Sequence, residues 1–290
     1  MRDYVITVNS TIDVPLEWLE ERGVKVAPLK YTIDNETYVD MYGLSGREFF
    51  DKLREGKIPE TSQVNPAEAR AMMEPILKEG KDILHLTFSS ALSGTYNSMR
   101  LAADELMDEY PEAKIIIVDT LCACLGEAIL LHHVLKQKAA GKTIEEAAQW
   151  AEENKLHVMH DVTIDSLDHL HRGGRLSKAS AVLGSIVKIK PIIIMNDEGK
   201  LEVIAKERGR KKAMNRIVDM AVEQSKGWED VNDIVMITHG DCEEDAEALA
   251  EIVRKKMGID NVFINNIGTV IGGHTGPGVL SVFCMGEKRK

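Results

Sequence analysis

Three short loops in this chain combine hydroxyl groups, glycines and one histidine, and each lies next to an apolar run. They are Thr61–Gln63, Ser89–Thr95 and, near the C-terminus, Ile271–Gly278. Hydroxyl, imidazole and backbone N–H groups hold a small anion by hydrogen bonds without having to react themselves. The loops therefore indicate a binding site for a ligand with an acidic head, rather than the reactive centre of a hydrolase.

Two of these loops also have simpler interpretations. Ser93-Gly94-Thr95 fits an ordinary helix start, in which Ser93 accepts a hydrogen bond from the first turn. That interpretation is compatible with anion binding, since a helix N-terminus attracts anions. The loop has neither the G-x-S-x-G pattern of a nucleophile elbow nor the Lys and spacing of a phosphate-binding P-loop. Taken alone, Thr61-Ser62-Gln63 is typical of a plain polar loop more often than of a site.

The third loop is rich in glycine. Residues Ile271–Gly278 include four glycines, Pro277 and His274. Glycines at this density bring the backbone close to another group. An imidazole there can donate a hydrogen bond to a carboxylate. The alternative is a tight connection between strands in which the histidine is incidental.

Composition and charge narrow the class of protein. The chain has 290 residues, of which 44% are hydrophobic and 29% charged, as in globular proteins. A net charge of -11 argues against general affinity for nucleic acid. Residues 166–216, however, contain twelve Lys or Arg against five Asp or Glu. This basic segment suggests a docking surface or an anion site, with a solvated basic face as the alternative.

No segment of the sequence predicts membrane insertion, disulfides or a metal site. No apolar run reaches the roughly 18 residues that span a bilayer, and the N-terminus lacks the features of a secretory signal. The four cysteines are too few and scattered for a disulfide framework. The histidines lack the spacing of metal ligands. We expect a cytoplasmic protein with at most transient membrane contact.

Residues 1–156 alternate apolar strands with amphipathic helices. Strands are predicted at 4–8, 24–29, 83–87 and 115–119, a small hairpin at 31–38, and helices at 95–109 and 125–140 and after capping patterns at Ser45, Asn65 and Thr143. The alternation predicts a mainly parallel sheet with helices on both faces. Ligands of such sheets bind beyond the carboxyl ends of the strands. The polar residues expected at that edge are Asn9, Ser10, Thr11, Ser89, Ser90 and Thr120.

Residues 157–290 follow a different pattern. Strands are predicted at 157–164, 192–196, 200–205, 234–238, 262–267 and 279–284, and helices at 210–225 and 243–256. The turn Asp197–Gly199 joins two neighbouring strands into a hairpin, so part of this sheet is antiparallel. We therefore predict two α/β domains, 1–156 and 157–290, the second with a mixed or antiparallel sheet. No flexible linker separates them, so we expect them to be in close contact.

Taken together, these segments resemble the DegV family of bacterial lipid-binding proteins over nearly the whole chain. Each motif is weak alone, but their common order is specific. The motifs that carry the resemblance are Thr61–Gln63, Ser89–Tyr96, Gly173–Arg175, Ile189–Ile192, Arg208–Lys212 and Gly272–Gly278. The resemblance implies a two-domain fold that holds one long-chain fatty acid in a tunnel between the domains. The acid would be the ligand, with no cofactor.

The resemblance also implies a function and roles for single residues. Several family members are subunits of fatty acid kinase that present the acyl carboxylate to a separate ATP-dependent kinase subunit, and have no catalytic residue of their own. Thr61, Ser93 and His274 would contact the carboxylate. The residues that would complete the loops around it are Ser62, Gly94 and Thr275. The arginines that would dock the kinase subunit are Arg172, Arg175, Arg208 and Arg210.

Two departures from the family pattern bear on the ligand. Asn9 stands where the family commonly has Asp after the first strand, which removes a negative charge. Cys122-Ala123-Cys124 replaces small polar or apolar residues, and would change chain selectivity if it lined the acyl channel.

Other functions remain open at this stage. The chain would be a stand-alone lipid carrier or sensor if it had no kinase partner. A serine esterase using Ser93 and His274 is a further alternative. A nucleotide-binding dehydrogenase is disfavoured, because no G-x-G-x-x-G follows the first strand.

Overall fold

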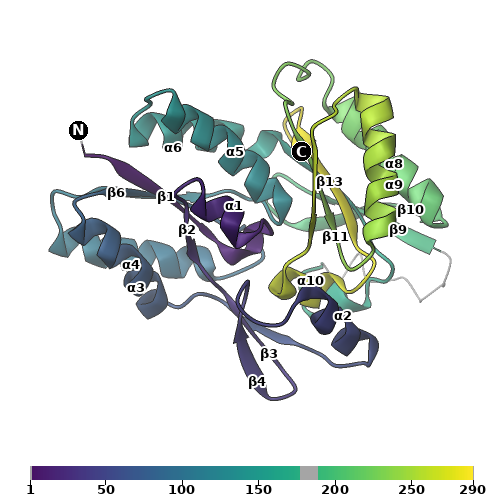
Figure 1. The fold of residues 1–290 in the computed structure, drawn as a ribbon, viewed down its shortest axis with the longest axis horizontal. Helices are drawn as coiled ribbons and strands as arrows, with labels where there is room; N and C mark the ends of the chain where they lie inside the picture. Colours follow the sequence, from purple (N-terminus) through teal and green to yellow (C-terminus); the bar gives the residue numbers. More distant parts are fainter. Residues whose placement is uncertain (1, 177–188, 290) are drawn as a thin grey trace.

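The strand–helix alternation of the first half folds into a parallel sheet. The computed structural model describes residues 2–176 and 189–289, and this sheet has the strand order β2-β1-β6-β7 (Figure 1). Its strands are β1 (Tyr4–Asn9), β2 (Lys25–Ala27), β6 (Asp82–Thr87) and β7 (Ile115–Asp119). One face is covered by α3 (Pro66–Lys78) and α4 (Thr95–Glu109), the other by α5 (Leu125–Ala139) and α6 (Ile144–Asn154). The predicted α/β arrangement is confirmed.

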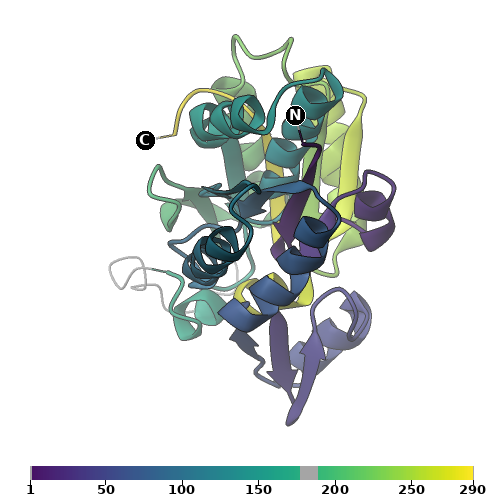
Figure 2. The ribbon, with the colours of Figure 1, turned by 90° about the vertical axis from the view of Figure 1, so that its left-hand side faces the viewer.

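A small antiparallel sheet projects from the first half of the chain (Figures 1 and 2). Its order is β4-β3-β5, and its strands are β3 (Lys30–Ile33), β4 (Glu36–Val39) and β5 (Glu60–Ser62). Three short helical segments also belong to the first half: η1 (Ser10–Ile12), α1 (Leu16–Glu20) and α2 (Gly46–Arg54). This sheet matters for the site because β5 carries Thr61 and Ser62, which the sequence alone left as a polar loop.

The second half forms a mixed sheet with the order β10-β9-β8-β13-β11-β12. Its strands are β8 (Val158–Thr163), β9 (Ile189–Met195), β10 (Leu201–Arg208), β11 (Val235–His239), β12 (Val262–Asn266) and β13 (Leu280–Met285). Only β11 and β12 pair in parallel, and the remaining pairs are antiparallel. The helical segments of this half are η2 (Lys155–His157), α7 (Asp168–Arg172), α8 (Arg210–Gln224), α9 (Glu243–Met257) and α10 (Thr269–Thr275).

The two faces of the mixed sheet have different partners. Side chains alternate between the faces of a strand, and one set packs with α8 and α9 into a core of its own, which includes Met159, Ile192, Leu280 and Ile217. The opposite face turns toward the first half of the chain, where α5 contacts β8, β11 and β13. The buried residues on this side join the core of the first half.

The capping patterns read from the sequence are present. Ser45, Asn65 and Thr143 each accept a hydrogen bond from the backbone N–H three residues later, and the Glu at that position bonds back to the cap. These boxes satisfy N–H groups that have no partner within the helix. The predicted bounds of the helix at 95–109 and of the strand at 115–119 agree with α4 and β7.

The glycine-rich segment near the C-terminus differs from the prediction. It was expected to be a loop over Ile271–Gly278, but its first half is the helix α10, which ends at Thr275. Only Gly276 and Gly278 adopt positive φ, of 74° and 80°, as the chain turns into β13. Gly272 and Gly273 lie inside the helix because it packs closely: a Cβ there would come within 2.9 Å of Phe50 and 2.8 Å of Pro59.

The division of the chain near residue 156 stays a proposal. It is supported by the distribution of the described strands, since those of the first two sheets precede Thr120 and those of the mixed sheet follow His157. The helices α5 and α6 lie between them in sequence.

The capping box at the start of α6 should contribute to the free energy of unfolding. The hydroxyl of Thr143 accepts a hydrogen bond from the N–H of Glu146 at 3.2 Å, and the Glu146 carboxylate accepts one from the N–H of Thr143 at 2.8 Å. Thr143→Ala should lower the free energy of unfolding by about 1 kcal/mol, as is usual for loss of a helix cap. Thr143→Ser keeps the hydroxyl and serves as the control. Equal urea midpoints for wild type and Thr143→Ala would contradict this assignment.

Candidate ligand-binding cavity

A cavity lies between the mixed sheet and the carboxyl edge of the parallel sheet. Its lining includes alternate residues of β8, namely His160 and Val162, followed by Ile164 just after the strand, and alternate residues of β13, Ser281 and Phe283. Because alternate residues share a face, a single face of the mixed sheet forms one wall. Its empty volume is about 1020 Å³ including the space at its mouth.

The opposite wall comes from the first half of the chain. Phe88 and Leu92 follow β6, and Ala123 and Cys124 precede α5. Leu29, Ile267 and Val270 add further apolar surface. Most of the lining is therefore hydrophobic and suits an apolar ligand segment.

Most of the polar lining residues come from three segments that contact one another, and we call this region the polar end of the cavity. All six residues that the sequence suggested for an anion site line it: Thr61, Ser62, Ser93, Gly94, His274 and Thr275. They come from β5, the start of α4 and the last turn of α10. The fold thus brings together three segments that are far apart in sequence.

Hydrogen bonds hold these segments in register. Thr61 Oγ1 lies 2.9 Å from His274 Nε2, and Ser93 Oγ lies 2.9 Å from Thr95 Oγ1. The Thr275 hydroxyl donates to the carbonyl of Ile271 at 3.3 Å. Ser93 accepts from the N–H of Thr95 at 3.2 Å, but Gly94 is the residue at the cap position. The interpretation of Ser93 as the helix cap is therefore wrong, because Gly94 occupies that position and no side chain caps α4.

Two glycines allow the close approach of polar groups at this end. A Cβ at Gly94 would lie 2.2 Å from Oε1 of Gln63, and a Cβ at Gly173 would lie 2.2 Å from Nδ1 of His274. The Gln63 amide donates to Ser98 at 3.0 Å, which links β5 to α4. Any larger residue at Gly173 would push the imidazole out of its place.

His274 is neutral in this environment. Burial, followed by the positive charge of Arg175 and the nearby His169, lowers the pKa of its imidazole to about 4. Arg175 also lines the cavity. Its Nε donates to the carbonyl of Leu92 at 3.2 Å and its Nη1 to that of Gly173 at 2.6 Å. The guanidinium therefore contributes charge to the polar end while two of its N–H groups are bound to backbone.

The four arginines predicted for docking differ in their exposure and in their hydrogen-bond partners. Arg172, at the end of α7, and Arg208, at the end of β10, are exposed. Arg175 is held at the cavity as described. Arg210 is 19% exposed and is bound within the chain, to Asp245 at 2.8 Å and to the carbonyl of Gly278 at 2.6 Å. Of the four, Arg172 and Arg208 are the ones free to meet a partner.

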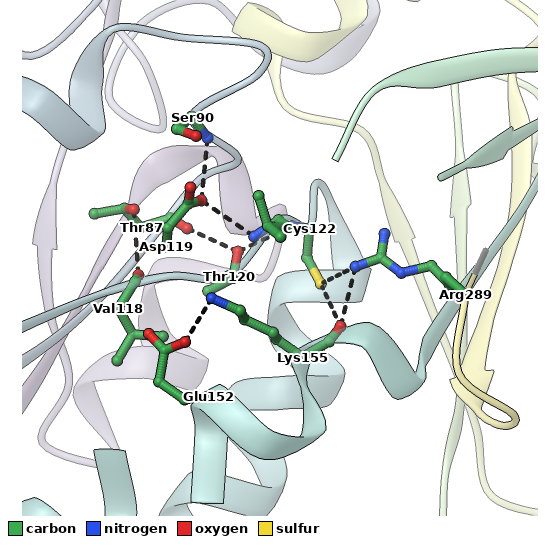
Figure 3. Close-up of polar contacts among 10 residues, drawn as sticks. Thr87, Ser90, Val118, Asp119, Thr120, Cys122, Glu152, Lys155 and Arg289 are labelled. Atoms are coloured by element: carbon green, nitrogen blue, oxygen red, sulfur yellow. Dashed lines mark hydrogen bonds and ion pairs between the residues drawn. The ribbon is translucent and has the colours of Figure 1, made fainter. Parts of the chain in front are cut away.

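The polar residues at the strand ends do lie together, but they bond to the protein rather than face the cavity. Thr120 Oγ1 donates to the carbonyl of Thr87 at 2.7 Å and accepts from the N–H of Cys122 at 3.1 Å (Figure 3). Asn9 Oδ1 accepts from the N–H of Phe88 at 3.1 Å, and Ser89 donates to the carbonyl of Gly199 at 2.9 Å. The loops after the strands carry backbone groups without sheet partners, and these side chains satisfy them.

The two cysteines of the 122–124 segment point in different directions. Cys124 lines the cavity. Cys122 is fully buried and faces away, with its Sγ 3.7 Å from the carbonyl of Lys155 and 3.9 Å from Nη2 of Arg289 (Figure 3). Burial raises the pKa of the Cys122 thiol to about 12, so it stays protonated. Only Cys124 and its neighbour Ala123 are placed to affect the shape of the cavity.

The sequence did not predict that residues of the mixed sheet line the cavity. His160, Met195 and Leu201 line the cavity, and the strands that contain all three had been predicted. Alternation along β8 was the available signal, but it does not say which face meets a cavity. Within residues 2–176 and 189–289 there is no group of three or more His, Cys, Asp or Glu arranged to hold a metal ion. The described helices are all too short or too polar to cross a membrane.

Known proteins with similar sequences and structures share this architecture. A DegV domain-containing protein of Clostridium perfringens is 43% identical, with both chains covered completely. A solved structure from Thermus thermophilus, described as showing fatty acid binding of a DegV family protein, is 29% identical, covers 99% of this chain and 100% of its own, and superposes with a TM-score of 0.87. DegV of Bacillus subtilis, described as a fatty acid binding protein, is 27% identical over 98% of this chain and 100% of its own, with a TM-score of 0.85.

The family assignment rests on the whole chain. The sequence profile of the DegV family, whose description is that of an uncharacterised protein family, matches residues 3–287. The fold, the relatives and the profile agree, and this chain belongs to the DegV family.

Proposed function

We propose that this protein binds one long-chain fatty acid in the cavity and presents its carboxylate to a separate kinase subunit. The observation that carries the proposal is a cavity lined mostly by apolar residues, with polar groups from three contacting segments that carry Thr61, Ser93 and His274. Relatives with the same fold, from Thermus thermophilus and Bacillus subtilis, are described as fatty acid binding.

The acyl chain of a fatty acid favours an apolar environment, whereas its carboxylate requires hydrogen bonds. The cavity provides both. Each methylene removed from water contributes about 0.8 kcal/mol, against the loss of chain and rigid-body freedom. Burying a carboxylate without hydrogen-bond partners would cost more free energy than burial of the acyl chain contributes. Hydroxyls and a neutral imidazole supply hydrogen bonds, and the nearby charge of Arg175 favours the anion. We therefore place the carboxylate between β5, the start of α4 and α10.

The same arrangement suits a carboxylate that must react. A forked pair of hydrogen bonds from an arginine would occupy both carboxylate oxygens, but two of the Arg175 N–H groups are already bound to backbone carbonyls. The carboxylate oxygen keeps a lone pair for attack on the γ-phosphorus of ATP. The O–P bond forms as the bond from the γ-phosphorus to the β–γ bridging oxygen breaks, and ADP leaves. The partner subunit would supply ATP and Mg²⁺.

An esterase is less well supported. A serine nucleophile requires a base within hydrogen-bond reach, yet the Ser93 hydroxyl lies against Thr95 and the His274 ring against Thr61. A stand-alone carrier would use the same cavity. It differs from our proposal only in lacking the kinase partner.

Mass spectrometry tests the binding step. The organic extract of the purified protein should contain one equivalent of a long-chain fatty acid. Delipidated protein should take one back on addition. An extract without acyl lipid, together with no uptake of added acid, would contradict the proposal.

The hydroxyl of Ser93 should contribute directly to affinity. Ser93→Ala removes one hydrogen bond to a charged group, worth about 1.5–3 kcal/mol, and should weaken fatty acid binding roughly ten- to hundredfold. Isothermal titration with delipidated protein measures this change. Ser90→Ala, at an exposed residue outside the cavity lining, is the control. Equal affinity of Ser93→Ala and wild type would remove Ser93 from the site.

The bound carboxylate should change the titration of His274. In delipidated protein the imidazole should titrate near pH 4, because burial disfavours its charged form. A carboxylate beside it favours the charged form, so binding should raise this pKa. NMR of the ring signals, assigned with His274→Gln, follows both states. A pKa that does not move on binding would mean that the carboxylate lies elsewhere.

The kinase partner should depend on an arginine beside the polar end. Arg172 is exposed and adjacent to Gly173, which packs on His274. Arg172→Ala should leave fatty acid affinity unchanged and reduce ATP-dependent acyl phosphate formation by a fatty acid kinase subunit. Arg254→Ala, in the last turn of α9, is the matched control. Normal phosphoryl transfer by Arg172→Ala would show that docking does not use this residue.

A further inference from the structure

A second cavity lies against the first and shares two residues with it. Its empty volume is about 620 Å³ including its mouth. Of its lining residues, only His160 and Met195 also line the main cavity. These two residues therefore border both spaces, and we call them the partition.

His160 lies on the part of β8 that is farther from α7 and from His274. The strand β8 leads through Thr163 toward α7, and α7 contacts α10, which carries His274. His160 lies four residues before Ile164 on this path, about 13 Å at the rise of a β-strand. The pairing of Ile192, Ile193 and Ile194 with Thr163, Val162 and Asp161 sets Met195 at the level of His160.

His160 is the fixed half of the partition. Its Nε2 accepts a hydrogen bond from the N–H of Ala123 at 3.2 Å, and its Nδ1 lies 3.1 Å from the carbonyl of Val158. The ring packs edge-on against Phe283, with centroids 5.2 Å apart. A Cβ at Gly126 would lie 2.2 Å from Nε2, so the helix α5 also closes on the ring. Contacts on several sides hold this imidazole in place.

Met195 is the half that can move. It is the last residue of β9, beyond the last pair that β9 makes with β8. The side chain is unbranched with three rotatable bonds, and methionine adapts to irregular spaces more readily than other apolar residues. The second cavity behind it offers apolar surface from Met159 and Ile194.

The far side of the second cavity is closed by the C-terminal segment. The N–H of Glu287 donates to the carbonyl of Gln224, and that of Arg289 to the carbonyl of Leu156, both at 2.8 Å. The Arg289 guanidinium is 8% exposed and donates to the carbonyl of Lys155 at 3.0 Å. These bonds anchor the segment on both sides of the space.

We propose that Met195 sets the acyl chain length, and that the second cavity receives the methyl end of chains too long for the main cavity. This inference rests on the proposed function, because it takes a fatty acid as the ligand. The carboxylate stays at the polar end, and a longer chain displaces Met195 while His160 remains in place. The protein then binds not only the fatty acids that fit the main cavity but also longer ones.

The test compares saturated fatty acids of increasing length on three proteins. Met195→Ala removes the movable half of the partition, and should raise affinity for the longest acids at least tenfold relative to wild type while leaving the shortest unchanged. Met73→Ala makes the same chemical change at a buried residue of α3 that lines neither cavity, and should keep the wild-type length profile. Competition binding with delipidated protein, read by mass spectrometry, gives all three profiles.

A volume-conserving variant keeps the test valid if Met195→Ala fails to fold. Met195→Leu retains the bulk but is branched and has one fewer rotatable bond, so it should bind short acids normally and long acids more weakly than wild type. Coinciding profiles for wild type and the folded Met195 variants, or an equal shift for Met73→Ala, would overturn the inference alone. Failure of the wild type to bind any acid would instead overturn the proposed function.

Discussion

The polar end of the cavity depends on a contact between distant parts of the chain, that of Thr61 with His274. Their side chains lie 2.9 Å apart although 213 residues separate them in sequence. The contact joins β5 of the small sheet to α10 near the C-terminus, and both segments are too short to be stable alone. Since the imidazole is neutral, the pair offers hydrogen bonding without placing a charge in a site that excludes water.

Buried acids on the other side of α10 support this contact. The hydroxyl of Thr269 donates to Asp40 at 2.7 Å, and the N–H of Gly268 donates to Asp13 at 2.9 Å. Burial raises the pKa of both carboxyls, and for Asp13 the charge of Asp40 raises it further. These bonds fix the start of α10 on the first half of the chain. The position of His274 is thus determined by residues that do not touch the cavity.

The apolar part of the site follows from how the two halves of the chain meet. One face of the mixed sheet packs on α8 and α9, and the other contributes a wall with alternate residues of β8 and β13. The loops after the parallel strands are tied down by their own side chains, as Thr120 and Asn9 show. They leave Phe88 and Ala123 to face the mixed sheet. A groove between rigid walls is suited to a flexible apolar chain, whose entropy is the main cost of binding.

Local signals predicted much of the fold and the residues of the polar end. Capping boxes at Ser45 and Thr143 identify helix starts because their hydrogen bonds lie within a few residues. The nature of α10 could not be predicted in this way, since its glycines indicate a turn and the helix forms where they pack against Phe50 and Pro59. The partition by His160 and Met195 was equally inaccessible, because alternation along a strand does not reveal where two cavities meet.

Crystals of delipidated protein grown with a fatty acid brominated at its methyl end test the central claim most directly. The account predicts carboxylate density within hydrogen-bond distance of Thr61, Ser93 and His274, and an anomalous bromine peak beside His160 and Met195. Bromine near the polar end, or an acid bound outside the cavity, would contradict it.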